Sequence, residues 1–172
     1  MTLPWPEATE IIEPGGELAI GGRVFQAIAA PGHSDQHLVF YSAADRLLLC
    51  GDAVLAKITP NVSRWPDSHP DPLSDFLGSL DRLSDLQVEL ALPGHGPIIH
   101  GFAQRVAELR QHHAERLQVM LAAVGPAANA FEVCTRVFPT STLSPHQLRF
   151  AIAETLAFAD PGLPVLEPYL SA

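Results

Sequence analysis

The chain has 172 residues, of which 47% are hydrophobic, and this is enough for a domain with a packed core. Its formal net charge of −9 disfavours tight non-specific binding to nucleic acid or to an anionic membrane. No apolar run is long enough to cross a bilayer, and the first residues lack the pattern of a signal peptide. The cysteines Cys50 and Cys134 do not suggest a disulfide scaffold, so we expect a reduced, cytoplasmic protein.

The first part of the chain predicts two β-hairpins. Residues 17–20 and 23–29 are predicted as strands joined by a Gly-Gly turn. Residues 37–42 and 46–50 form the second predicted hairpin. These strands are nearly continuous in apolar residues, which favours a sheet that helices cover on at least one face.

A long loop and a helix are predicted next. Residues 53–71 have no regular period, and a loop of this length over a compact sheet is often functional. The pair Asp71-Pro72 is typical of a helix N-cap followed by proline in the first turn. Apolar residues then recur at helical spacing as far as Leu83, which predicts a helix over this segment.

A short apolar strand is predicted at residues 88–92, before the longest helix at residues 102–124. One stripe of this helix is expected to be buried, and it consists of Phe102, Val106, Leu109, His113, Leu117, Met120 and Val124. Two further helices, at residues 129–138 and 146–159, precede a short extended tail, an order that suggests a winged-helix-like unit. The fold class is therefore α/β or α+β.

Three apolar runs each end in a glycine that is followed by a metal-type ligand. Gly32 leads to His33, Gly51 leads to Asp52, and Gly94 leads to His95. A strand that ends in glycine can turn sharply and present the next side chain at the rim of the sheet. We expect the three side chains to meet at one edge of the molecule, where His and Asp would form part of a transition-metal site.

The remaining histidines admit simpler interpretations. His37 follows His33 by four residues, at the start of a strand, where it would either orient a metal ligand or only make a loop hydrogen bond. Asp52 alone would be an ordinary strand-end cap. His112 and His113 lie in the long helix, and a hydrogen-bonded or snorkelling histidine is the expectation there.

Taken together, the segments 31–37, 50–52 and 92–97 resemble, in order, three metal motifs of the metallo-β-lactamase superfamily. The resemblance is greatest to its glyoxalase II-like hydrolase branch, in which some members carry a winged-helix-like C-terminal unit and one subgroup is an endoribonuclease. It implies that residues 1–125 form the second half of an αββα sandwich. It also implies that residues 126–172 form the winged-helix-like unit.

The resemblance assigns roles to the candidate residues. His33 would bind a first metal ion, His95 a second, and Asp52 would bridge both as the catalytic carboxylate. His37 would either hold one of these ligands in position without binding metal itself, or only pack against them. The two metals, zinc or sometimes iron or manganese, would activate water for attack on a thioester, ester or phosphodiester.

The chain departs from the family in one respect, because it contains no His-x-His sequence. The signature His-x-His-x-Asp-His supplies four further ligands in the complete fold. We therefore expect this chain alone to represent the C-terminal part of the fold, to bind zinc weakly or not at all, and to be inactive. A sheet face that lacks its partner sheet would be exposed, and either a homodimer or a rearranged N-terminal segment would cover it.

Two other functions are kept as alternatives. The first is a non-catalytic module that binds a partner or regulates one. The second is nucleic-acid binding through the C-terminal helix pair. From residue 126 onward there are two Arg and no Lys against four acidic residues, which disfavours the second alternative.

Overall fold

The computed structural model describes residues 10–124 and 129–158. Five strands form one sheet in the order β1-β2-β3-β4-β5, with β1 at Glu17–Ile20, β2 at Arg23–Ala29, β3 at Leu38–Ser42, β4 at Leu47–Gly51 and β5 at Leu90–Pro93. The pairs from β1 to β4 are antiparallel, and β5 lies parallel to β4. Both predicted hairpins are therefore confirmed.

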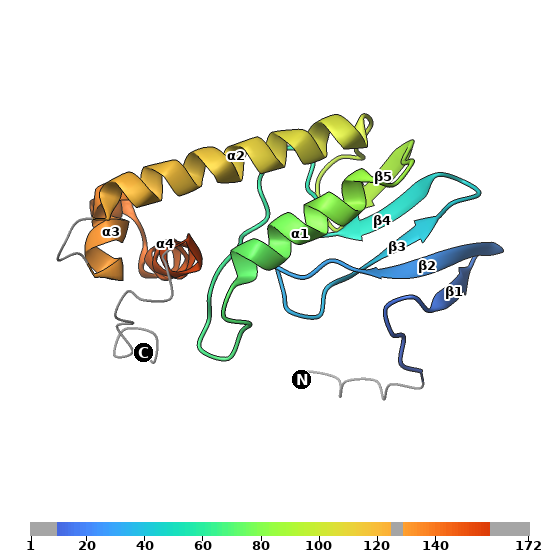
Figure 1. Cartoon of the computed structure of the whole chain (residues 1–172), viewed down its shortest axis with the longest axis horizontal. Coiled ribbons are helices and arrows are strands. Elements are labelled where there is room, and N and C mark those ends of the chain that lie inside the picture. The colour runs from blue at the N-terminus through green and yellow to red at the C-terminus, as the bar shows by residue number, and fades with distance from the viewer. Residues whose placement is uncertain (1–9, 125–128, 159–172) are drawn as a thin grey trace.

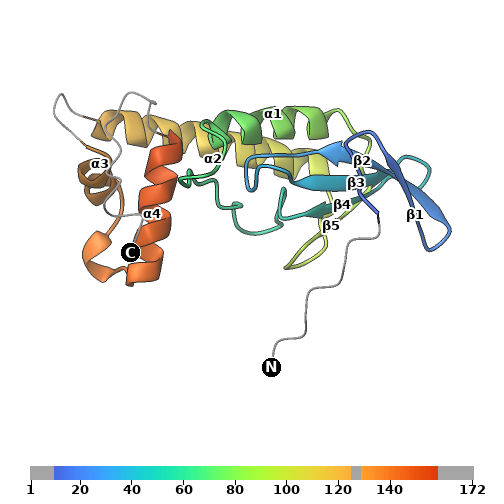
Figure 2. The same cartoon turned by 90° about the horizontal axis from the view of Figure 1, so that it is seen from below.

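The helices of the described residues are α1 at Pro72–Ser84, α2 at Phe102–Ala123, α3 at Ala130–Val137 and α4 at Pro145–Phe158, with a short 3-10 turn at Thr140–Thr142. Figures 1 and 2 show α1 and α2 on one face of the sheet, with α3 and α4 at the far end of α2. This arrangement is the α+β fold that the sequence predicts. The tail expected beyond α4 lies outside the described residues, and no described helix is long and apolar enough to cross a membrane.

The beginning of α1 has the cap that the sequence predicts. Asp71 Oδ1 accepts a hydrogen bond from the backbone N–H of Ser74 at 3.0 Å, and Pro72 occupies the first helical position. Phe76, Leu80 and Leu83 then face the core with almost no exposed surface. The cap fixes where α1 begins, and its apolar stripe fixes which side meets the sheet.

Two local predictions need correction. The fifth strand begins at Leu90 rather than at residue 88, because the backbone N–H groups of Leu86 and Val88 make turn hydrogen bonds to Leu83 and Leu86. The buried stripe of α2 also ends earlier than predicted. Val124 lies after the last residue of the helix, is 37% exposed, and contributes nothing to the core.

One buried cluster runs through the whole described structure. It joins the sheet, α1, α2, α3 and α4, and includes Val39, Leu48, Phe76, Leu80, Val106, Leu109, Val133 and Phe158. The core therefore continues across the boundary expected near residue 125. The division of the chain into two units stays a prediction.

The second face of the sheet carries apolar side chains that do not belong to this cluster. Along each strand, successive side chains alternate between faces, so the neighbours of buried Val39, Leu48 and Ala91 point away from the helices. These neighbours are half-buried, and they are Leu38, Phe40, Leu47, Leu49, Leu90 and Leu92. No described helix covers this face (Figure 2).

Candidate metal centre

The three predicted positions come together at one edge of the sheet. His33 follows the turn after β2, Asp52 directly follows β4, and His95 lies two residues beyond β5. The Nε2 atom of His33 is 3.8 Å from Asp52 Oδ2, and the Nε2 atom of His95 is 3.7 Å from Asp52 Oδ1. Each histidine therefore faces a different oxygen of one carboxylate.

These distances suit ion binding better than direct hydrogen bonding. Both exceed the range for an N–H···O bond. Two donor atoms on one tetrahedral zinc lie about 3.4 Å apart, given metal–ligand distances of about 2.0–2.2 Å. Asp52 Oδ1 is buried and has no hydrogen-bond partner among the described residues, and an unpartnered buried carboxylate oxygen favours a nearby cation.

The arrangement is nevertheless incomplete as a metal cage. No group of three or more His, Cys, Asp or Glu side chains within residues 10–124 and 129–158 is arranged to hold an ion by itself. The donor chemistry fits a divalent metal, with one carboxylate between two imidazoles. That His33, Asp52 and His95 bind metal stays a prediction.

The orientation of His33 is set by the long loop. Its Nδ1 atom lies 2.9 Å from the carbonyl oxygen of Asn61. A carbonyl only accepts hydrogen bonds, so Nδ1 carries a proton, and in the neutral ring the lone pair of Nε2 then lies on the side of Asp52. Sequence reasoning did not find this contact, because a main-chain carbonyl leaves no signal in the residue type.

His37 contacts the backbone of Asp52 rather than its carboxylate. The N–H of Asp52 donates to Nε2 of His37 at 3.3 Å. Burial, followed by the neighbouring His33, lowers the pKa of His37, while Asp52 opposes the shift. A neutral ring with Nε2 as acceptor suits a residue that holds the backbone of Asp52 in place. That His37 supports a metal ligand stays a prediction.

Two glycines allow close packing next to the rim residues. Gly32 has φ of +122°, and a Cβ there would collide with the backbone of Phe76. A Cβ on Gly94 would lie 2.6 Å from Asp52 Oδ1. Gly32 therefore lets the turn before His33 pack against α1, and Gly94 lets the chain pass close to the Asp52 carboxylate.

Two further histidines lie outside the candidate centre. His69 contacts acidic residues: its Nδ1 lies 2.6 Å from Asp75 Oδ2, and its backbone N–H donates to Asp35. The expectation that His113 is hydrogen-bonded or snorkels is wrong. Its side chain is buried, and neither ring nitrogen has a hydrogen-bond partner among the described residues.

Comparison with known proteins identifies the family. The sequence model of the metallo-β-lactamase superfamily matches residues 3–95. The chain belongs to this superfamily. Its fold agrees with that assignment: a metallo-β-lactamase family protein from Thermus thermophilus superposes with a TM-score of 0.79 at 39% identity, over 89% of this chain and 48% of that one.

Curated relatives cover a smaller share. A β-lactamase-like protein 2 homolog from Caenorhabditis elegans is 31% identical over 110 residues, which are 64% of this chain and 35% of the relative. An atrochrysone carboxyl ACP thioesterase from Aspergillus fumigatus is 28% identical over 120 residues, which are 69% of this chain and 35% of the relative. The chain thus spans about a third of these relatives, which include a hydrolase.

Proposed function

We propose that the chain supplies one side of a divalent-metal hydrolase centre. The observation that supports this most directly is the Asp52 carboxylate, whose two oxygens each face a different histidine at 3.7 and 3.8 Å. A bound metal, zinc in this proposal, would activate water for attack on a thioester, ester or phosphodiester. The chain's own residues would hold the metal and keep it in position.

Each residue has a defined part in the proposal. His33 and His95 would each donate Nε2 to a metal ion, and Asp52 would bind between them as the catalytic carboxylate. His37 would hold the backbone of Asp52, and the Asn61 carbonyl would keep His33 in the tautomer that leaves Nε2 free.

We also propose that the chain by itself binds zinc weakly and is inactive. Three protein ligands shared between two metal positions leave most of each coordination sphere to water. The sequence contains no His-x-His that could complete it. The alternative, a non-catalytic module that binds a partner, is supported by the apolar sheet face outside the core cluster.

Zinc binding tests the proposal directly. The purified chain, dialysed with zinc at increasing free concentrations, should take up the ion with low affinity. Asp52→Asn should lower that affinity at least about tenfold, while Glu132→Gln, at an exposed position of α3 at the far end of α2 (Figure 1), should not change it. Equal uptake by wild type and Asp52→Asn would contradict the site. Tightly retained stoichiometric zinc would contradict weak binding.

Hydrolysis assays test the activity separately. A thioester and an RNA oligonucleotide should both remain intact with the chain alone. Zinc-dependent cleavage of either one, lost in Asp52→Asn, would overturn the inactivity and would identify the substrate class. Absence of cleavage together with Asp52-dependent zinc binding is the expected pair of results.

Location and assembly complete the proposal. A cytoplasmic location is supported by the two cysteines, both of which are free and buried. Burial raises the pKa of the Cys50 thiol to about 12, so this side chain is a packing group rather than a reactive one. A homodimer is proposed to cover the second face of the sheet.

A further inference from the structure

The loop that follows β4 carries two elements of the candidate centre. Asp52 begins this loop, and further along it the main-chain carbonyl of Asn61 holds the ring of His33. Between them, residues 53–60 contain no helix or strand. The backbone groups of such a segment are not paired within a regular element, so the path of the chain from Asp52 to Asn61 depends on other partners.

One side chain of α2 supplies two of these partners. Arg105 lies in the first turn of α2, and its Nε donates to the carbonyl oxygen of Leu55 at 2.7 Å. Its Nη2 donates to the carbonyl oxygen of Ile58 at 3.0 Å. Leu55 comes three residues after Asp52, and Ile58 comes three residues before Asn61. The guanidinium therefore holds the middle of the loop between the two elements of the centre.

The geometry and burial of Arg105 suit this role. Its planar guanidinium has donors in fixed directions, so a single side chain can set the relative position of two carbonyl groups. Its Nη1 donates to Oε2 of Glu108, on the next turn of α2, at 3.0 Å. The Arg105 side chain is 15% exposed, and hydrogen bonds from a charged donor are stronger than neutral ones where water is largely excluded. Water therefore competes little for the contacts with the loop.

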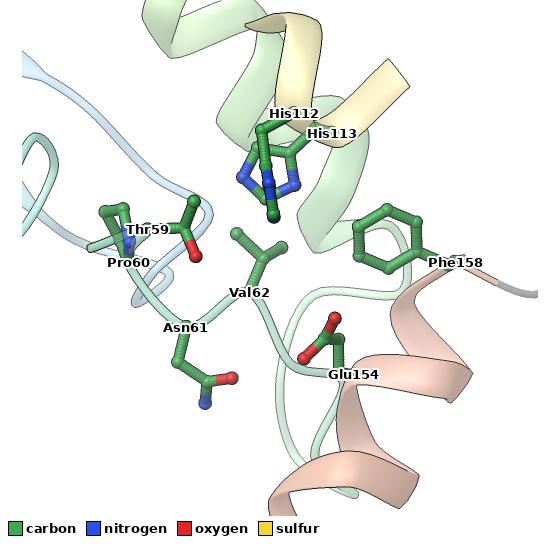
Figure 3. A pocket seen from close by; sticks show the side chains of 8 residues that line it. All are labelled: Thr59, Pro60, Asn61, Val62, His112, His113, Glu154 and Phe158. Atoms are coloured by element: carbon green, nitrogen blue, oxygen red, sulfur yellow. The ribbon is translucent and has the colours of Figure 1, made fainter. Parts of the chain in front are cut away.

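Beyond Ile58 the loop borders open space. Residues 59–62 line one side of a pocket of about 160 Å³, and His112 of α2 lies across it (Figure 3). Since side chains do not fill this space, packing against α2 does not by itself fix the Asn61 carbonyl. The hydrogen bond from Arg105 holds the chain three residues earlier, at Ile58.

We propose that Arg105 is a positioning residue of the candidate centre. By holding the loop at two carbonyls, it fixes the backbone on the C-terminal side of Asp52 and also the Asn61 carbonyl that orients His33. Its effect on metal affinity rests on the proposed function, whereas its effect on the geometry of Asp52 and His33 exists without metal. The two effects are therefore measured separately.

The first measurement uses the full chain without metal. Arg105→Met keeps an apolar stem but removes every donor. The hydrogen-bonded amides of Asp52 and Ala53 should then exchange with solvent at least about threefold faster. In ¹⁵N nuclear magnetic resonance, the share of the Nδ1–H tautomer in the His33 ring should fall. Arg105→Lys keeps the charge and can reach one carbonyl at a time, so it should restore part of both properties.

The second measurement is zinc affinity. Loss of a group that orients a metal ligand weakens metal binding about 10- to 100-fold, and Arg105 acts one step further away, so Arg105→Met should weaken zinc binding about three- to tenfold. Arg136→Met is the matched control. Arg136 of α3 also donates to a main-chain carbonyl, that of Ala123 at 2.7 Å, at the far end of α2 (Figure 1). This control should match wild type in zinc affinity, amide exchange and the His33 tautomer.

Several results would overturn the proposal. One is unchanged amide exchange and an unchanged His33 ring in a folded Arg105→Met protein, even if its free energy of unfolding falls. Another is the same set of changes in Arg136→Met, because the changes would then reflect general loosening. Wild-type zinc affinity in Arg105→Met would also do so. If wild type binds no zinc but the changes without metal occur, the proposed function fails and the positioning role stands.

A measurement on wild type covers the case in which Arg105→Met fails to fold. The Nε–H of Arg105 should exchange with water at least about tenfold more slowly than the Nε–H of Arg110, which lies on the same helix and is 45% exposed. Equal rates would show that the contact with the Leu55 carbonyl does not persist in solution, and the proposal would be wrong.

Discussion

The backbone N–H of Asp52 donates a hydrogen bond to Nε2 of His37 at 3.3 Å. This bond joins the residue before β3 to the residue after β4, outside the hydrogen bonds that pair the two strands. This hydrogen bond involves only the backbone N–H of Asp52 and not its side chain. Its carboxylate oxygens are therefore available to His33 and His95, on either side. A histidine that makes no contact with a metal can thus still determine where the central carboxylate lies.

Replacement of His37 by Ala should make the backbone at Asp52 more mobile. The half-buried N–H would lose its acceptor, at a cost of about 1–3 kcal/mol in the free energy of unfolding. Urea unfolding measures this cost, and hydrogen exchange at the Asp52 amide should become faster. His37→Gln, which offers an acceptor oxygen, should recover part of both. An unchanged Asp52 exchange rate in His37→Ala would show that the bond has no positional effect.

Replacement of Gly94 by Ala should disturb the centre, because the added methyl group would lie 2.6 Å from Asp52 Oδ1. We expect a loss of about 1–3 kcal/mol in the free energy of unfolding and a displaced Asp52 side chain. The matched change Gly78→Ala lies in α1 and meets only Arg82 at 3.6 Å. It should stabilise the protein by about 0.5–1 kcal/mol. Similar effects of both substitutions in denaturant unfolding would contradict the close approach at residue 94.

Acid should destabilise the protein through His113. Its pKa is lowered from 6.5 to about 4 by burial, so between these values the unfolded chain binds more protons than the folded one. Stability from this group is full above about pH 6.5 and is lost as the pH falls toward 4. From pH 7 to pH 5 the loss is about 2 kcal/mol. In urea unfolding at both pH values, His113→Phe should lose that much less, and equal pH dependence in the two proteins would refute the assignment.

The sheet face that no described helix covers should cause association. In light scattering after size-exclusion chromatography, wild type should have twice the 18.5 kDa mass of one chain. Phe40→Asp places a charge at the centre of this face and should give a monomer. Val24→Asp, at an exposed position on the other side of β2, should leave the dimer intact. A wild-type protein that runs as a single species of 18.5 kDa would rule the dimer out.

The sequence predicted the fold well where local signals were strong. The Gly-Gly turn set the first hairpin, and Asp71-Pro72 set the start of α1, because each depends only on neighbouring residues. The three rim positions were predictable for the same reason, since each glycine directly precedes its ligand-type residue. Their meeting at Asp52 followed from the sheet order.

Other features depend on contacts between distant segments, and local patterns do not encode these. The partnerless state of His113 results from Phe76 and Phe158, which come from two other helices. The link between Asn61 and His33 joins residues 28 apart through a main-chain oxygen. The start of β5 was misplaced because backbone turn bonds at Leu86 and Val88 outweigh the apolar character of that segment.

The hydrogen bond between His33 and a main-chain oxygen affects which substitutions the protein tolerates. Any amino acid at position 61 keeps a carbonyl group, so a substitution there removes the bond that the Asn61 side chain accepts from Ser63 but leaves the acceptor for His33 in the main chain. The side chain at this position is thereby freer to vary, in evolution or in a designed library, than the backbone conformation that points its carbonyl at His33.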